Sequence, residues 1–87
     1  MARMYVWHKV SNFKNWKKVY DEMHDLRKQF GCTGENVFHH DKNANELLVI
    51  TSWGSKEEAM KYGKSPELKK GMEKAGVVTV PDISFSD

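Results

Sequence analysis

Apolar side chains recur at intervals of three and four residues between Asn12 and Phe30. This spacing is typical of an amphipathic helix, because turns of 3.6 residues place such positions in one continuous stripe. Ser11 and Asn12 supply a capping signal at the start, and Gly31 supplies a stop. The pattern therefore predicts one helix over residues 12–30. The residues of its stripe are Phe13, Trp16, Val19, Tyr20, Met23, Leu26 and Phe30.

Segments in which apolar and polar residues alternate flank this helix. Such alternation predicts strands, because successive side chains of a strand point to opposite faces. The predicted strands cover residues 3–10, 35–40 and 46–53, and a last strand begins after Pro81. The polar turn at 41–45 joins two of them as an antiparallel hairpin.

Capping signals predict two shorter helices near the C-terminal end. Ser55 opens a capping box, from which a helix extends to Gly63. Ser65 and Pro66 provide an N-cap and a proline at the first helical position, and this second helix ends at Gly76. The order β-α-β-β-α-β predicts a single ferredoxin-like α+β domain over residues 1–87, an antiparallel sheet with helices on one face.

Strands 3–10 and 46–53 carry bulky side chains on both faces, yet the helices cover only one face. The face left open carries Tyr5, Trp7, Leu48 and Ile50. An exposed apolar patch of this kind marks an interaction surface, and a second copy of the chain is the commonest partner. The sequence therefore predicts a homodimer through the open sheet face.

Composition limits the classes of function. The net charge is +2, and 30% of the residues are charged. Because the lysine pairs are flanked by acids, this balance argues against a nucleic-acid footprint. The same element order also occurs in RNA-recognition domains, but residues 46–53 lack the Gly-Phe pattern of that class. No apolar run is long enough to span a membrane and Cys32 stands alone, so we expect a cytoplasmic protein without membrane association.

His8 is the most informative single residue, because an imidazole on an apolar strand face needs a hydrogen-bond partner or a use. One interpretation is a core histidine bonded to Tyr20, Thr51 or a backbone carbonyl. The other is a general base that faces a pocket, with the Tyr62 hydroxyl orienting the substrate. His39 and His40 are adjacent on a strand and point to opposite faces, so no metal site is expected there.

The segments YVWHKVSNFKNWKKVYDE, LLVITSW and SPELKKGMEKAGV, with the short closing strand, resemble the dimeric α+β barrel proteins. That superfamily includes antibiotic biosynthesis monooxygenases, stress-responsive A/B-barrel proteins and small polyketide cyclases. The resemblance implies a dimeric α/β barrel with a pocket between the helices and the sheet of each subunit. The residues that it places at the pocket, besides His8 and Tyr62, are Val6, Trp16, Tyr20, His24, Val49, Thr51 and Trp53.

The resemblance leaves two functions open. The first is a cofactor-free enzyme, monooxygenase-like or cyclase-like, acting on a small hydrophobic or aromatic molecule. Tyr62 matches the tyrosine of plant polyketide cyclases, but their histidine falls at Leu68. The second is a non-catalytic dimeric module that binds such a ligand or is purely structural. A cavity of roughly 300 Å³ or more beside His8, polar at one end, would favour a ligand site. Packing of Trp16, Tyr20 and Trp53 against His8 would contradict both ligand-based functions.

Overall fold

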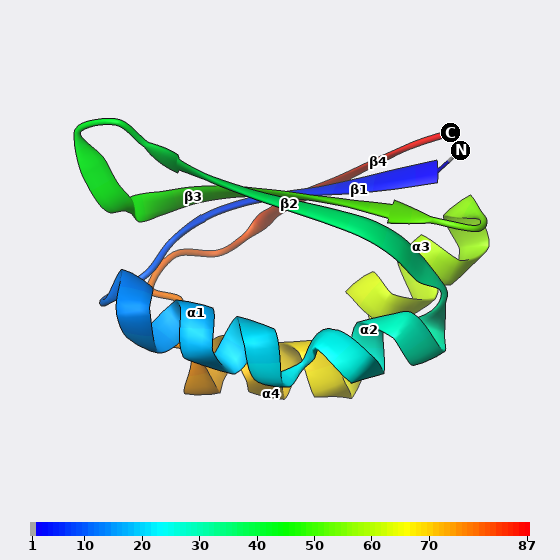
Figure 1. The fold of residues 1–87 in the computed structure, drawn as a ribbon, viewed down its shortest axis with the longest axis horizontal. Helices are drawn as coiled ribbons and strands as arrows, with labels where there is room; N and C mark the ends of the chain where they lie inside the picture. Colours follow the sequence, from blue (N-terminus) through cyan, green and yellow to red (C-terminus); the bar gives the residue numbers. More distant parts are fainter. Residues whose placement is uncertain (1) are drawn as a thin grey trace.

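The helices of this chain cover one face of an open four-stranded sheet, in a computed structural model that describes residues 2–87 (Figure 1). The strands are antiparallel and lie in the order β2-β3-β1-β4, which confirms the predicted ferredoxin-like arrangement. The sheet of one chain does not close into a barrel. The elements are β1 (Ala2–Lys9), α1 (Phe13–Glu22), α2 (His24–Phe30), β2 (Cys32–His40), β3 (Asn43–Trp53), α3 (Lys56–Gly63), α4 (Pro66–Lys74) and β4 (Asp82–Ser86).

The helix predicted over residues 12–30 is interrupted, and the prediction of one continuous helix is wrong. Met23 leaves helical geometry with φ −90° and ψ 4°, and α2 then starts without a side-chain cap. The interruption contains neither glycine nor proline, so no local signal announces it. The predicted ends are confirmed: Asn12 caps Asn15 N–H at 3.0 Å, and Gly31 stops α2 with φ 109°.

The hairpin between β2 and β3 is tighter than the sequence suggests. His40 pairs with Asn43, so only two residues form the turn, and β2 already begins at Cys32. Extended pairing satisfies backbone groups that a longer polar turn would leave to water. The predicted capping residues of α3 and α4 are confirmed, because Ser55 Oγ accepts from Glu58 N–H and Ser65 Oγ accepts from Leu68 N–H.

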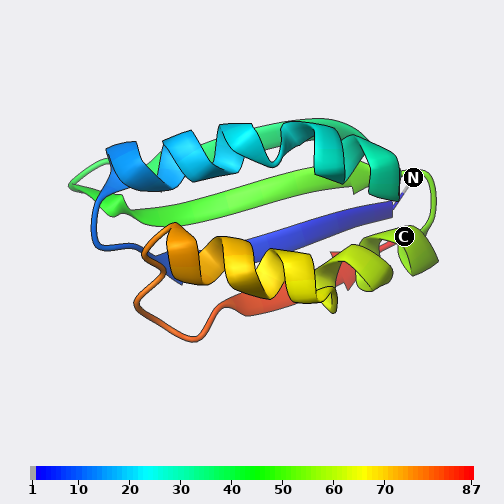
Figure 2. The same ribbon diagram turned by 90° about the horizontal axis from the view of Figure 1, so that it is seen from below.

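The four helices form two rows on the same face of the sheet. Figure 2 shows α1 and α2 in one row and α4 and α3 in the other. The central strands β1 and, from Leu47 on, β3 alternate in burial, so that one side of each is buried beneath these rows. The buried residues of these strands are Ala2, Met4, Val6, His8, Leu47, Val49, Thr51 and Trp53.

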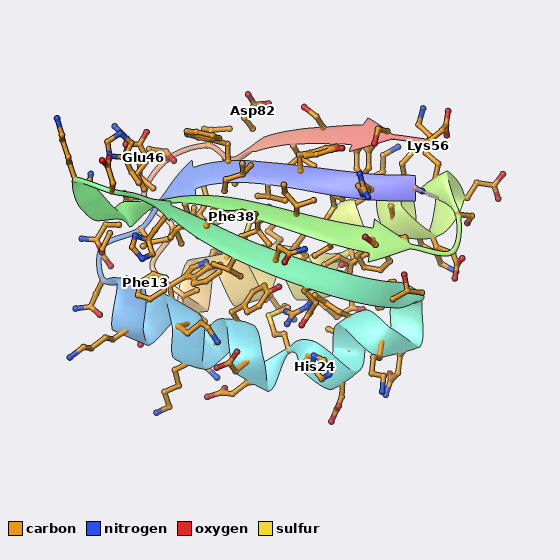
Figure 3. All side chains as sticks on the ribbon, turned by 45° about the horizontal axis from the view of Figure 1, so that its top comes forward. Phe13, His24, Phe38, Glu46, Lys56 and Asp82 are labelled. Atoms are coloured by element: carbon orange, nitrogen blue, oxygen red, sulfur yellow. The ribbon has the colours of Figure 1, made fainter. Side chains whose placement is uncertain are left out.

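The opposite face of the sheet is covered by none of the helices in residues 2–87 (Figure 1). Trp7 of β1 is 48% exposed there, and Phe38 of β2, which pairs with Leu48 of β3, is 51% exposed. Figure 3 shows Phe38 on this bare side. Tyr5, Leu48 and Ile50 are half-buried beside them. Among the helices of residues 2–87, none is both long and apolar enough to cross a membrane.

Candidate ligand-binding site

A cavity lies between the buried face of β1 and β3 and the two rows of helices. Its volume is about 50 Å³, well below the roughly 300 Å³ of a typical small-molecule pocket. Met23 and Gly71 of α4 meet in its lining, where a Cβ added at Gly71 would collide with the Met23 sulfur. The lining residues are Met4, Val6, His8, Trp16, Val19, Tyr20, Met23, Arg27, Val49, Thr51, Tyr62, Leu68, Gly71, Met72 and Ala75.

His8 reaches the cavity from β1 and is 3% exposed. Neither ring nitrogen has a hydrogen-bond partner among residues 2–87, so the predicted bond to Tyr20, Thr51 or a backbone carbonyl is absent. The Thr51 hydroxyl is instead bonded by Trp53 Nε1–H at 2.8 Å. Burial lowers the pKa of His8 to about 4, and the imidazole is therefore neutral at pH 7. A neutral imidazole offers one donor and one acceptor, and both are unused here.

Aromatic rings from α1 form the wall next to His8. The Trp16 ring centroid is 5.8 Å from that of His8 and 4.8 Å from that of Tyr20, on which it stacks. The Tyr20 hydroxyl is buried with no partner in the described chain, and burial raises its pKa. Tyr20 is thus a neutral hydroxyl at any ordinary pH, available as a donor.

Arg27 on α2 completes the polar part of the cavity, and sequence analysis did not identify it. It is 3% exposed, and its guanidinium carbon lies 3.7 Å from the centroid of the Tyr20 ring. Arg27 Nε–H donates to Glu35 Oε2 at 2.6 Å, whereas Nη2 is buried without a partner in residues 2–87. Spacing could have revealed it, because Arg27 follows Tyr20 by seven residues and Met23 by four, within the same stripe.

Glu35 on β2 fixes the Arg27 guanidinium from outside the cavity. Burial acts to raise the pKa of this carboxyl, but hydrogen bonds from Arg27 and His24 outweigh it and lower the pKa. Glu35 is therefore a carboxylate at neutral pH. His24 Nδ1 lies 3.0 Å from Glu35 Oε1 and is mostly exposed, so it sits outside the cavity lining.

The structure brings most of the predicted pocket residues together. Val6, His8, Trp16, Tyr20, Val49, Thr51 and Tyr62 all line the cavity. Trp53 does not, because its ring is fully buried beneath Tyr62, 5.2 Å away between centroids.

His8 and Tyr62 are not a direct pair. His8 is opposite Leu47, whereas Trp53, which underlies Tyr62, is opposite Ala2. Six strand residues, or about 20 Å, separate these two registers. Burial raises the pKa of Tyr62, so it too is a neutral hydroxyl. Any joint action of the two residues would require a ligand that spans the cavity.

No set of three or more His, Cys, Asp and Glu side chains in residues 2–87 is arranged to hold a metal ion. The chemistry of the cavity is that of neutral hydrogen-bonding groups and one cation set in apolar walls. The fold and this cavity together define a small ferredoxin-like α+β domain with a buried pocket between sheet and helices.

The chain belongs to the antibiotic biosynthesis monooxygenase family, whose sequence model matches residues 2–74. Solved structures of similar fold include SnoaB, a cofactor-independent oxygenase from Streptomyces nogalater, with a TM-score of 0.79 and 9% identity over 99% of this chain and 90% of that one. A candidate antibiotic biosynthesis monooxygenase from Bordetella bronchiseptica has a TM-score of 0.82 and 10% identity, covering 99% and 94% of the two chains.

A further antibiotic biosynthesis monooxygenase structure has a TM-score of 0.75 and 12% identity over 100% of this chain and 97% of that one. At these identities the structural likeness establishes the fold alone. None of the curated proteins matches the chain in sequence.

Proposed function

We propose that the chain binds a small hydrophobic or aromatic molecule in this cavity and acts on it as a cofactor-independent monooxygenase. One observation carries the proposal: His8, Tyr20 and Arg27 bring buried polar atoms without partners to the same apolar cavity. Leaving one such atom unpaired costs about 1–3 kcal/mol. A ligand that offers partners to these atoms would recover part of that energy.

At about 50 Å³, with the Trp16 ring 5.8 Å from that of His8, the cavity is smaller than the size expected of a ligand site, so it must widen to admit an aromatic ring. Met4, Met23 and Met72 line it, and unbranched thioether side chains adapt their shape more readily than other apolar residues. The contact between Met23 and Gly71 joins the two helix rows across the cavity. Rotation of the Met23 side chain would therefore open the site without unfolding either helix.

The proposed reaction uses His8 as the base and dioxygen as co-reactant. His8 would take a proton from an activated ring CH₂, and the resulting carbanion would form a C–O bond with dioxygen. The imidazolium would return the proton to the peroxide. Loss of water, made from the second C–H proton and the outer oxygen, would break the O–O bond and leave a ring carbonyl. The neutral hydroxyl of Tyr20, whose ring stacks on Trp16 beside His8, can donate to the developing oxyanion.

A second candidate is binding without catalysis. The pKa of His8, about 4, makes it a weak base at neutral pH, and efficient general bases have pKa values near the operating pH. Cyclase chemistry has the least support. Leu68 lines the cavity at the position where the resemblance to polyketide cyclases would require a histidine, and a leucine side chain can act neither as an acid nor as a base.

Thermal shift with quinols and polyketide-like phenols tests the site. At about ten times Kd we expect an increase in Tm of roughly 5–10 °C for the natural chain. His8→Ala should abolish most of this increase, whereas His40→Ala, which changes an exposed histidine near a turn, should preserve it. An unchanged increase in His8→Ala would place the ligand elsewhere. Dioxygen uptake that needs both ligand and His8 would distinguish catalysis from binding.

We also propose that two copies of the chain associate through the open sheet face around Trp7. Support comes from the half-exposed rings of Trp7 and Phe38 on a face that no helix covers. Sedimentation of the natural chain at micromolar concentration should give twice the chain mass. Trp7→Lys should weaken association by about 30-fold or more, as expected at a central aromatic contact.

Val80→Lys provides the matched control for Trp7→Lys. Val80 is 94% exposed and lies outside the sheet, so the same charge placed there should leave association unchanged. A natural chain that sediments as a monomer at micromolar concentration would refute the proposed interface.

A further inference from the structure

Among the residues that the structure describes, Arg27 is the one cationic side chain that lines the cavity. Burial of a guanidinium is unfavourable unless its charge is paired and its donors are bonded. Glu35 provides the charge partner through Nε–H, at 2.6 Å. The Nη2 group of the same guanidinium has no partner within residues 2–87. Pairing with Glu35 therefore accounts for the buried charge but not for the unused donor.

Two contacts hold the guanidinium rigidly. The face of the fork rests on the Tyr20 ring, 3.7 Å from its centroid, and one edge is tied to Glu35. A planar guanidinium fixed in this way presents its remaining N–H donors in a constant direction. Met4, Met23, Leu68 and Met72 in the lining offer no acceptor. The Tyr62 hydroxyl also lines the cavity and interacts with Arg27, but Nη2 has no hydrogen-bond partner among residues 2–87. An occupant of the cavity is the partner that these donors lack.

We infer that the ligand is an aromatic acid whose ionised oxygen, a carboxylate or a phenolate, accepts a hydrogen bond from Arg27 Nη2. This inference rests on the proposed function, because it takes the cavity to be the ligand site. The ring of the ligand packs against Val6 and Val49 on the sheet, and the Tyr20 hydroxyl, also unpartnered, donates a second bond to the acid. Arg27 thus selects the charge of the ligand, whereas the apolar walls select its shape.

Glu35 does not cancel this selection. It bonds the Nε edge of Arg27 and is 22% exposed, so its own charge is partly solvated. Hydrogen bonds between ionised groups are about twice as strong as neutral ones. An ionised acid should therefore bind better than an uncharged amide of the same shape.

Calorimetric titration with 2-naphthoate and 2-naphthamide tests the inference, and the smaller pair benzoate and benzamide repeats the comparison. We expect the natural chain to bind the carboxylate about 10-fold more tightly than the amide. Arg27→Met should bring the two affinities within about 2-fold of one another, mainly by weakening the carboxylate. Lys28→Met removes the same charge from the neighbouring, exposed position on α2 and should keep the full preference.

Two further variants keep the test informative if Arg27→Met does not fold. The double variant Arg27→Met and Glu35→Gln removes both charges of the pair and should show the same loss of preference. Arg27→Lys keeps a charge without the planar fork and should retain only part of the preference. Equal binding of acid and amide to the natural chain overturns the inference while the cavity remains a ligand site. An unchanged preference for the acid in both Arg27→Met and the double variant does the same. Failure of all four compounds to bind the natural chain refutes the cavity as an aromatic ligand site and the inference with it.

Discussion

Replacing Glu35 with glutamine should destabilise the fold by about 2–3 kcal/mol. The reason is that Arg27, 3% exposed, would keep its buried charge and lose its only charged partner within residues 2–87. The value is at the lower end for buried pairs because Glu35 itself is 22% exposed and water screens it in part. Urea denaturation monitored by tryptophan fluorescence measures the effect. For a domain of this size, such a loss is a large share of a total stability of about 4–13 kcal/mol.

The matched comparisons are a double variant and an exposed pair. Arg27→Met together with Glu35→Gln should recover stability to within about 1 kcal/mol of the natural chain, because an apolar side chain has no charge to leave unpaired. Asp21→Asn breaks the exposed pair with Lys17 on α1 and should change little. If Glu35→Gln lowers the free energy of unfolding as little as Asp21→Asn does, the Arg27 charge is not buried away from water.

Acidification from pH 7 to pH 4 should cost the natural chain about 3 kcal/mol through His8 alone. The pKa of His8 is about 4 in the folded state, against 6.5 for an unperturbed histidine. Because the folded pKa is lower, the unfolded state binds the proton first, and stability falls as pH drops below 6.5 and towards 4. Above pH 6.5 the neutral imidazole carries no such penalty. Denaturation midpoints across this range measure the slope.

His8→Leu isolates the contribution of the imidazole. Its stability should decline less between pH 6.5 and pH 4 than that of the natural chain, and the difference should approach about 3 kcal/mol at the acid end. His40→Leu, at an exposed position, should follow the natural chain. The lowered pKa of Glu35 acts mainly below this window. Parallel pH curves for the natural chain and His8→Leu would show that His8 is not buried in its neutral form.

The element order could be predicted from the sequence because its signals are local. The side chains of Asn12, Ser55 and Ser65 cap the first turns that follow them, and Gly31 adopts the positive φ that favours glycine. Strand alternation was equally informative. The break at Met23 was not predictable in the same way, since neither glycine nor proline marks it and tertiary context can override local propensity.

The candidate site was predictable in its lining but not in its chemistry. The family resemblance placed Trp16 and Tyr20 at a pocket with His8, and both line the cavity with it. Arg27 was not among the predicted site residues, although its spacing puts it in the buried stripe. The absence of any partner for His8 depends on distances between packed elements, which sequence does not encode locally. Cavity volume depends in the same way on the methionine rotamers chosen in three dimensions.

The position of a bound aromatic acid is the most direct test of the cavity as the ligand site. The measurement is a set of intermolecular NOEs between the ring protons of 2-naphthoate and the ¹³C-labelled methyl groups of the chain. We expect contacts with Val6, Val49 and Met72, which line the cavity between sheet and helices. Contacts confined to Leu48 and Ile50, on the open face of the sheet, would contradict the assignment of the cavity as the ligand site.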